Sequence, residues 1–498
     1  MASAHAGMAE ARTDAIVVGG GGAGLAAAAE AAAQGLRVIL LEKGAALGGS
    51  TAWSVGSISA TRTPHQRAAG IVDSPDEHFE DLEILAGRYA NRDNRALRRL
   101  LVDNTTEMMA WLDGLGVVFV GPNPEPPHRH SRMHNVVPNS RAFPLLLGRH
   151  CRRLGVDIRL GCRADGWIRD GARITGVTAV EDHGRRIAIH AAAGVVLAGG
   201  DYSASPVLKA QLAGDEAAAL DPVNPGATGD GFTLGLAAGG SVLNGDIVRG
   251  PILRFVPPRR ANLLRRLPPS RPLARLMQWS FHHLPAALLR PFAMAFLTTA
   301  LGPSAELFRQ GAILVDSEGR RFTDELDKPG RDVAQHAGRL AYIVLDSALA
   351  EKFNRWPHFV STAPGVAYAY FDDYRRNRRD IFHEAATPLQ LARAIGARPE
   401  ALAEALASQP ALGEPPYYAL GPVKSYVVFT DGGLAVDTDH RVLGATGAPI
   451  PGLYAAGSNG QGGLLLEGHG HHLAWAFISG RRAGRHLAQS FMNRSTSA

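Results

Sequence analysis

Cysteine is scarce in this chain. The 498 residues include only Cys151 and Cys162, which is too few for a disulfide framework and lacks the paired spacing of a cysteine metal site. Scarce cysteine favours a reducing compartment, because disulfides are mostly a feature of secreted proteins. We therefore expect a cytoplasmic protein without a metal centre.

Long apolar runs are also missing. Residues 1–13 show neither the cationic start nor the apolar core of a signal peptide. The stretch Leu288–Leu301 is interrupted by Arg290 and Pro291, and it falls short of the roughly 20 residues needed to cross a bilayer. We therefore expect neither a signal peptide nor a transmembrane helix.

Acidic residues are absent between Asp246 and Glu306, although the net charge of the whole chain is only +6. One interpretation is an irregular cap segment with solvated arginines. Another is a peripheral membrane contact, or an entrance for an apolar substrate, through residues 249–290. Nucleic acid is not an expected partner, because no recognised binding module accompanies the charge. The arginines of this segment are Arg249, Arg254, Arg259, Arg260, Arg265, Arg266, Arg271, Arg275 and Arg290.

Glycine, in contrast, is abundant. The 57 glycines exceed the typical usage of about 7%, and they gather in a few runs. Such runs indicate backbone that approaches a ligand closely. The chain is 46% hydrophobic and 20% charged, which is typical of a globular protein, and its length predicts more than one domain.

The chain begins with the pattern of a strand–helix–strand unit. Residues 14–19 are expected to form a buried strand, because Ala15–Val18 are an unbroken apolar run. An alanine-rich helix is expected over 23–34, with Gly35 ending it, and a second strand over 37–42. Farther along, residues 156–163, 173–181 and 186–190 resemble short strands of a small sheet.

The glycine turn inside this unit fits a dinucleotide site. Gly19 permits the tight turn, Gly21 lets the backbone touch a pyrophosphate, and Gly24 allows the helix to pack closely on the strand. The helix N-terminus then faces the phosphate charge. Glu42 ends the second strand 18 residues beyond Gly24, where a carboxylate accepts the ribose hydroxyls.

Three later segments return to the same pattern. Gly48–Thr51 follows the second strand, Val195–Gly200 is an apolar strand ending in two glycines, and Gly452–Gly457 is a strand ahead of a helix over 471–490. The dinucleotide-binding parts therefore sit at both ends of the chain. A separate body lies between them.

Motifs along nearly the whole chain resemble one flavoprotein family. Asn224–Gly231, Gly319–Glu325 and Thr430–Gly433 occur in the order of the signatures of the FAD family related to the fumarate reductase and succinate dehydrogenase flavoprotein subunits. That family also includes 3-ketosteroid dehydrogenases and tricarballylate-type dehydrogenases. The resemblance implies an α/β fold: a Rossmann-like FAD-binding domain from residues 1–246 and 426–498, and an inserted α+β cap domain over 247–425.

The resemblance also implies the cofactor and the type of reaction. Hydride would pass between a substrate C–C bond and flavin N5, with an external electron donor or acceptor. Relatives that bind FAD covalently use a histidine that residues 50–53 lack, so we expect noncovalent FAD. The expected cofactor-binding residues are Gly19, Gly21, Gly22, Ala23, Gly24, Glu42, Lys43, Gly49, Ser50, Thr51, Gly199, Gly200, Asp230, Gly457, Gly470, His472 and Leu473.

The substrate is expected to differ from fumarate. The positions that resemble the dicarboxylate clamp of fumarate reductases hold Gly250, Phe429 and Glu467, and losing charge-assisted bonds to both carboxylates would cost several kcal/mol. An apolar cyclic or ketosteroid-like substrate with one carbonyl is expected instead. Two alternatives stay open: a carboxylate reductase or dehydrogenase of the fumarate or tricarballylate type, and a flavin-binding membrane-surface or partner protein with little turnover.

The candidate acid/base residues are Arg331, His469 and His471. By resemblance, Arg331 lies near the position of the proton-handling arginine of fumarate reductases, although its spacing from Glu325 departs from the family pattern by about two residues. His469 and His471 lie in the loop expected beside the flavin, and histidine exchanges protons near neutral pH. The His469–His472 cluster lacks a carboxylate and is not expected to bind metal.

Overall fold

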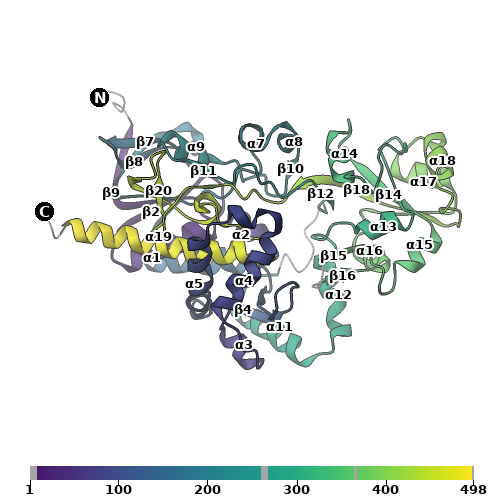
Figure 1. Ribbon diagram of the computed structural model, residues 1–498, viewed down its shortest axis with the longest axis horizontal. Helices are drawn as coiled ribbons and strands as arrows, with labels where there is room; N and C mark the ends of the chain where they lie inside the picture. The colour runs from purple at the N-terminus through teal and green to yellow at the C-terminus, as the bar shows by residue number, and fades with distance from the viewer. Residues whose placement is uncertain (1–7, 259–266, 364–366, 496–498) are drawn as a thin grey trace.

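Two sheets organise the computed structural model of this chain, which describes residues 8–258, 267–363 and 367–495. Within the described residues, one sheet has eight strands and the other has six. Figure 1 shows them at opposite ends of the long axis, with both chain termini at the end of the larger sheet. The structure confirms the predicted α/β fold with an FAD-binding part and a cap. The domain boundaries at 246/247 and 425/426 stay predictions.

The centre of the larger sheet is parallel. β1 (Ala9–Val18) lies between β2 (Val38–Glu42) and β9 (Arg186–Leu197), and β21 (Pro449–Ala455) pairs with β9 on its other side. The last residues of β1 are buried, as expected for strands covered on both faces. This order places the carboxyl ends of strands from the start, middle and end of the chain along the same edge of the sheet.

The prediction that residues 156–190 form a small separate sheet is wrong, because their strands join the larger sheet. β9 is a single strand of 12 residues, whose first residues pair with β8 (Arg173–Glu181) while the strand also runs parallel to β1. Residues 191–193 are alanines, which continue the extended strand without a break. β7 (Cys162–Asp170) and β8 therefore extend the main sheet instead of forming their own.

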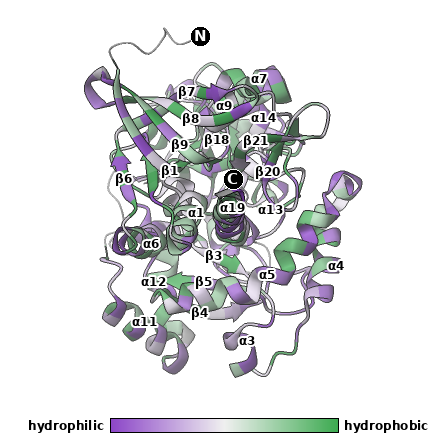
Figure 2. Ribbon diagram, turned by 90° about the vertical axis from the view of Figure 1, so that its left-hand side faces the viewer, coloured by the Kyte–Doolittle hydropathy of each residue, from purple (hydrophilic) through white to green (hydrophobic). Residues whose placement is uncertain are grey.

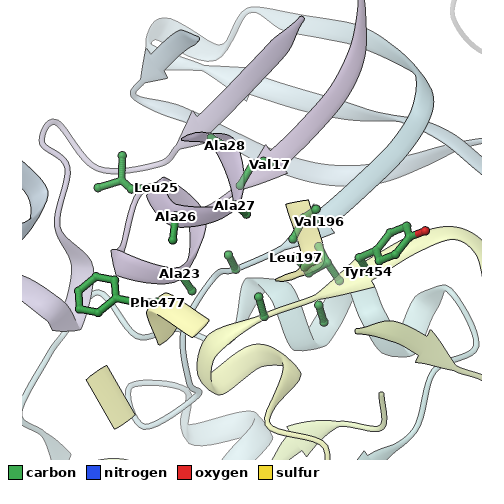
Figure 3. Packing of buried hydrophobic residues seen from close by; sticks show 14 of the residues in the cluster. Val17, Ala23, Leu25, Ala26, Ala27, Ala28, Val196, Leu197, Tyr454 and Phe477 are labelled. Atoms are coloured by element: carbon green, nitrogen blue, oxygen red, sulfur yellow. The ribbon is translucent and has the colours of Figure 1, made fainter. Parts of the chain in front are cut away.

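Helices α1 (Gly22–Ala33) and α19 (His471–Ser495) pack against each other beside this sheet. Figure 2 views the pair along its axes, side by side. A Cβ atom added to Gly480 would lie 2.2 Å from the Ala23 carbonyl oxygen, and one added to Gly484 would lie 2.3 Å from that of Ala27. The alanines of α1 and Phe477 of α19 are buried in the same apolar core at this interface (Figure 3). Only small residues permit this approach.

The smaller sheet is built on one long strand. β18 (Tyr417–Val427) pairs with β14 (Ala341–Leu345), β12 (Ile252–Phe255), β17 (Phe382–Ala385) and β10 (Asp221–Pro222). Its apolar residues form a second core. Two helices of the segment between β12 and the rest of the cap, α11 (Arg271–His283) and α12 (Ala286–Leu297), connect the two bodies: α11 packs on β4 (Val118–Asn123) and α12 packs on α16 (Phe371–Asn377). The basic segment is therefore partly helical and not irregular.

The remaining elements complete the two bodies. The other helices are α2 (Gly49–Trp53), α3 (Pro64–Ala68), α4 (Pro75–Ala86), α5 (Arg95–Gly114), α6 (Ala142–Arg153), α7 (Pro206–Ala213), α8 (Asp215–Ala218), α9 (Asp230–Ala237), α13 (Ala305–Arg309), α14 (Pro329–Gln335), α15 (Ser347–Lys352), α17 (Pro388–Ile395) and α18 (Pro399–Ala407). The 3-10 turns are η1 (Gly87–Arg92), η2 (Asp182–Gly184) and η3 (Gly457–Gly460). The other strands are β3 (Ser57–Ser59), β5 (Met133–Val137), β6 (Asp157–Leu160), β11 (Val242–Leu243), β13 (Ile313–Val315), β15 (Ser361–Ala363), β16 (Ala367–Ala369), β19 (Gly433–Leu434) and β20 (Arg441–Leu443).

Replacing Gly484 by alanine tests the contact between α1 and α19. The added methyl group meets the Ala27 backbone, so the helices must separate, and we expect the free energy of unfolding to fall by about 1–3 kcal/mol. Gly114→Ala is the matched control, because a Cβ there meets no atom within 4 Å and alanine favours the helix. Urea unfolding of both variants measures the difference. Equal stability of the two variants would contradict close packing.

Candidate functional site

One large cavity runs between the two bodies. Its volume is about 2150 Å³, which is more than twice the roughly 1,000 Å³ upper range of ordinary ligand pockets. One end is lined by the glycine-rich loops at the edge of the larger sheet, and the other end by α11, α12 and the β4–β5 hairpin. The cavity therefore has room for a cofactor and for a second ligand beside it.

The glycine loop after β1 forms the floor of the first end. Gly19 has a φ of +110°, and a Cβ there would lie 2.4 Å from the Ala198 carbonyl oxygen. A Cβ on Gly24 would lie 1.8 Å from the Gly19 carbonyl oxygen. Gly21 caps α1 without a side chain, so the first turn of the helix presents backbone N–H groups to the cavity. Such a cradle fits a pyrophosphate.

Glu42 closes the loop at the end of β2. Its carboxylate accepts hydrogen bonds from the Gly20 and Gly44 N–H groups, each at 2.7 Å. Each oxygen retains a lone pair for a ribose hydroxyl. The predicted position of Glu42 thus fits the adenosine side of FAD.

Lys43 and Asp230 form an ion pair at 2.5 Å on the cavity wall. Burial opposes ionisation of Asp230, but hydrogen bonds from Lys43 and Thr228 outweigh it and lower the pKa of this carboxyl. Asp230 is therefore ionised at neutral pH. It holds the lysine against the wall at the start of α9.

Nearly all predicted cofactor residues line this cavity. The exception is Gly24, which packs against the turn of Gly19 below the surface. Sequence reasoning missed Arg163 and Asn224, which also line the cavity, and the buried Asn459, which contacts the lining residue Gly199. Asn224 donates to Ser50 Oγ at 2.8 Å, and the Asn459 amide oxygen accepts from the Gly199 N–H at 3.2 Å. Arg163 lies in β7 and Asn459 in η3, and Asn224 begins the segment Asn224–Gly231, but no periodic pattern marks these three side chains as part of the site.

His472 lies at the N-terminus of α19 and lines the cavity. Burial lowers its pKa to about 4, so the ring is neutral at pH 7. Its Nε2 atom is buried, lies 3.8 Å from Asp431 Oδ1 and has no hydrogen-bond partner among the described residues. The Phe429 ring lies against the His472 ring, with the ring centres 4.1 Å apart and the planes tilted by 53°. A buried polar atom without a partner fits a bound cofactor that would supply one. FAD is compatible with this end of the cavity.

His469 faces the same cavity from the preceding loop and is paired with a buried carboxylate. Its Nδ1 atom lies 2.5 Å from Glu125 Oε1, and Glu125 also accepts from the His469 backbone N–H at 2.7 Å. The hydrogen bond to Glu125 raises the pKa of His469, against the opposing effect of burial. Because Nδ1 is engaged, Nε2 is the nitrogen available to the cavity. Glu125 had no sequence signal of its own.

His471 points away from the cavity and is not among its lining residues. It is fully buried with His78 and His128, and its Nε2 lies 3.1 Å from that of His78. Burial lowers the pKa of His78 and of His471 well below 6.5. Helical geometry separates adjacent residues by about 100°, so His471 and His472 face different environments. The expected acid/base position of His471 is therefore not supported.

The cluster of His78, His128 and His471 has metal-like spacing, with ring nitrogens within 4.8 Å of one another. However, Arg132 donates to Nδ1 of His128 at 3.0 Å. The same guanidinium binds both oxygens of Asp73, which belongs to the second cluster of this kind, with Glu77 and His130. A buried arginine inside both clusters opposes a second cation there.

Arg331 lies outside the cavity. It belongs to α14, its side chain is 43% exposed, and its Nη2 pairs with Glu216 at 2.6 Å. The pairing is a surface contact between α14 and α8. The structure therefore brings His469, but neither Arg331 nor His471, to the cavity wall.

The position of the expected clamp arginine holds an ion pair instead. Glu467 pairs with Arg249, whose guanidinium also binds the buried carboxylate of Asp431 at 2.5 Å. Burial raises the pKa of Glu467 despite this arginine. Because two carboxylates neutralise Arg249, it offers little charge to an anionic ligand.

A family described as "FAD binding domain" matches residues 14–252 and 281–464 of this chain. The match covers the glycine loops of residues 19–24, 48–51 and 199–200 and most of the cap. Between its two parts it leaves out residues 253–280, which include Arg271–Ser280 of α11, and it ends before α19.

Individual relatives extend over nearly the whole chain. A fumarate reductase (cytochrome) from Shewanella frigidimarina is 26% identical over 96% of this chain and 77% of its own length. A vinyl phenol reductase from Lactiplantibacillus plantarum is 28% identical over 96% of each chain. The open conformation of a flavocytochrome c3 fumarate reductase has the same fold, with a TM-score of 0.74, 23% identity, and coverage of 98% of this chain and 80% of that one.

Proposed function

Because the chain belongs to the FAD-binding domain family and is an FAD-dependent oxidoreductase, we propose that it acts on a C–C bond next to a carbonyl in an apolar, ring-shaped substrate. The reaction is either reduction of the C=C bond or its formation from the saturated compound. The observation that carries this proposal is the apolar chamber beside the FAD-binding end of the cavity.

The chamber is walled by apolar side chains from both bodies. Such a surface favours a hydrophobic ligand, because each apolar group that leaves water contributes to binding. The lining also includes polar side chains, among them Asn123, Asn135 and Asn377, and such groups fix the orientation of a ligand in small-molecule sites. The apolar lining includes Val120, Val137, Leu284, Leu288, Phe292, Leu301 and Phe429.

Loss of the dicarboxylate clamp supports the same substrate class. Phe429 occupies one clamp position and packs against His472, and the Glu467–Arg249 pair occupies another. The vinyl phenol reductase among the relatives is named for an uncharged substrate. A neutral carbonyl compound suits these groups better than fumarate does.

His469 is the proposed proton donor and acceptor. Bound FAD supplies hydride chemistry at the carbon β to the carbonyl. His469 Nε2 gives a proton to the α carbon during reduction and takes one from it during dehydrogenation, while Glu125 holds Nδ1–H and fixes the ring. Glu125 is thus a positioning residue. It stabilises the protonated ring, which the donor needs at neutral pH.

Arg254 favours a second candidate substrate class. It lies in the cavity wall at the cap side, where it donates to the Ala300 carbonyl oxygen. A guanidinium there suits an unsaturated acid with one carboxylate. A third reading, a flavin-binding protein with little turnover, predicts no reaction with either class.

A substrate panel tests the proposed function. Holoprotein reduced anaerobically with dithionite should regain its oxidised flavin spectrum within seconds of mixing with a cyclic enone, because the enone accepts the hydride. Fumarate and cinnamate, as carboxylate acceptors, should act slowly or not at all. Faster reoxidation by the acids would favour the Arg254 alternative. Reduced flavin that persists with every acceptor would overturn the proposal.

We further propose that FAD is held without a covalent bond, because residues 50–53 of the flavin-facing segment contain no histidine. Precipitation of the holoprotein with trichloroacetic acid should leave a colourless pellet and a yellow supernatant. The supernatant should contain intact FAD on chromatography. Yellow colour that stays with the pellet would show a covalent link.

Glu125→Gln tests the role of His469 through pH. The acid form of His469 is present below its pKa, which Glu125 holds above 6.5. The rate of enone reduction should therefore decline as the pH rises through the pKa of His469. Removing the negative charge lowers the pKa, and the alkaline limb of the rate profile should move down by about one pH unit.

Glu77→Gln is the matched control for this experiment. Glu77 also lies beside a histidine, with its carboxylate 3.2 Å from His130 Nε2, but neither residue lines the cavity. Its pH profile should match that of the unmodified protein. A Glu125→Gln profile that keeps its alkaline limb in place would exclude His469 as the titrating group.

A further inference from the structure

Helices α11 and α12 expose an unusual amount of apolar surface. Trp279 is 52% exposed, Leu288 60% and Phe292 63%, and Leu276, Phe281 and Leu284 are exposed as well. Figure 1 shows both helices together at the lower edge of the molecule, where they span from the larger sheet side to the cap. Contiguous exposed apolar surface marks a site of interaction.

The charged side chains that α11 and α12 themselves contribute have one sign. Between Asp246 and Glu306 the sequence has no acidic residue, and Arg271 and Arg275 are exposed on α11. His282 and His283 follow at its C-terminal end, also exposed. A helix with apolar and basic side chains and no acids is complementary to an anionic phospholipid surface.

The two faces of α11 have different surroundings. Leu273, Met277 and Phe281 line the cavity, whereas Leu276 and Trp279 are exposed and are not among the lining residues. Trp279 stacks on His283 at 4.8 Å, which places an aromatic pair on the outer side. The helix is therefore the wall between the chamber and the surroundings.

The wall continues into α12, whose residues lie both at the surface and in the cavity. Leu288 and Phe292 of α12, and Leu284 between the two helices, are exposed and also line the cavity. The chamber thus opens at the apolar patch. Residues 253–280, which include Arg271–Ser280 of α11, lie outside the family match.

We propose that α11 and α12 form a docking surface for anionic phospholipid bilayers, and that apolar substrate enters the chamber from the bilayer at this surface. The entry route rests on the proposed function, whereas docking does not. None of the helices in the described part of the chain combines the length and apolar character needed to cross a bilayer, and docking is peripheral. Tryptophan at the outer face suits the membrane interface, where its ring is partly solvated.

A second copy of the chain is a poorer occupant of the same surface. A symmetric contact would place Arg271 and Arg275 of one copy near the same residues of the other. Without acidic residues in the segment, the like charges would repel. An anionic bilayer attracts these arginines and covers the apolar side chains at the same time.

Vesicle co-sedimentation of the FAD-loaded full chain tests docking. We expect binding to vesicles of phosphatidylcholine with phosphatidylglycerol, weak binding to phosphatidylcholine alone, and release at high salt, which screens the charges. The double substitution Leu276→Ser and Trp279→Ser should weaken binding about tenfold, since both side chains would otherwise leave water. Arg271→Gln with Arg275→Gln should remove the preference for the anionic lipid.

Val207→Ser with Leu389→Ser is the matched control, because both side chains are exposed and apolar but lie on α7 and α17, away from α11 (Figure 1). The control should bind as the unmodified protein does, and all variants should retain FAD. Absence of binding to anionic vesicles, or an equal loss in the control, would overturn docking. A concentration-dependent dimer that the Leu276/Trp279 variant abolishes would replace the bilayer with a second copy.

The substrate panel and the vesicle assay fail independently. Vesicle binding with no turnover would leave docking intact and remove the proposed reaction. Turnover of soluble enones without vesicle binding would leave the proposed reaction intact and remove docking. If substrate enters from the bilayer, the unmodified protein should reduce a vesicle-embedded enone faster than the Leu276/Trp279 variant does. Both proteins should reduce a water-soluble enone at equal rates.

Discussion

The close contact between α1 and α19 is the constraint on which the site depends. Gly480 and Gly484 let the C-terminal helix approach the backbone of the helix that follows the glycine loop. This contact places the start of α19, with His472, at the same cavity as Gly19–Ala23. Without it, residues more than 400 positions apart would not enclose one cofactor. The parallel pairing of β1, β9 and β21 fixes the remaining wall.

The loop before α19 assigns different chemistry to neighbouring histidines. His469 has a carboxylate partner that raises its pKa, whereas burial lowers that of His472 to about 4. One ring can therefore exchange a proton near neutral pH while the other stays neutral beside the flavin-binding end. His471, on the opposite side, is packed among neutral histidines. Environment, more than residue type, sets the role of each ring.

Local patterns in the sequence predicted which residues line the glycine-rich end of the cavity, because Gly19, Gly21 and Glu42 act through turns and strand ends that are visible within about 25 residues. Glu125 could not be predicted, since its partner His469 is 344 positions away and no periodicity links them. Arg331 was expected at the site by resemblance to a family motif whose spacing it does not match, and the fold placed it beside Glu216 on the surface. The sequence of the arginine-rich segment showed its composition but not which side chains face the cavity. Only the structure separates the cavity face of α11 from its outer face.

A crystal structure of the FAD-loaded protein with a bound cyclic enone tests the central claim most directly. The proposed chemistry predicts that the ring lies in the apolar chamber, with its α carbon within about 3.5 Å of His469 Nε2 and its β carbon against flavin N5. Glu125 should still hold Nδ1. A ligand bound with His469 turned away from it, or held by Arg254 with its double bond out of reach of His469, would contradict the assignment.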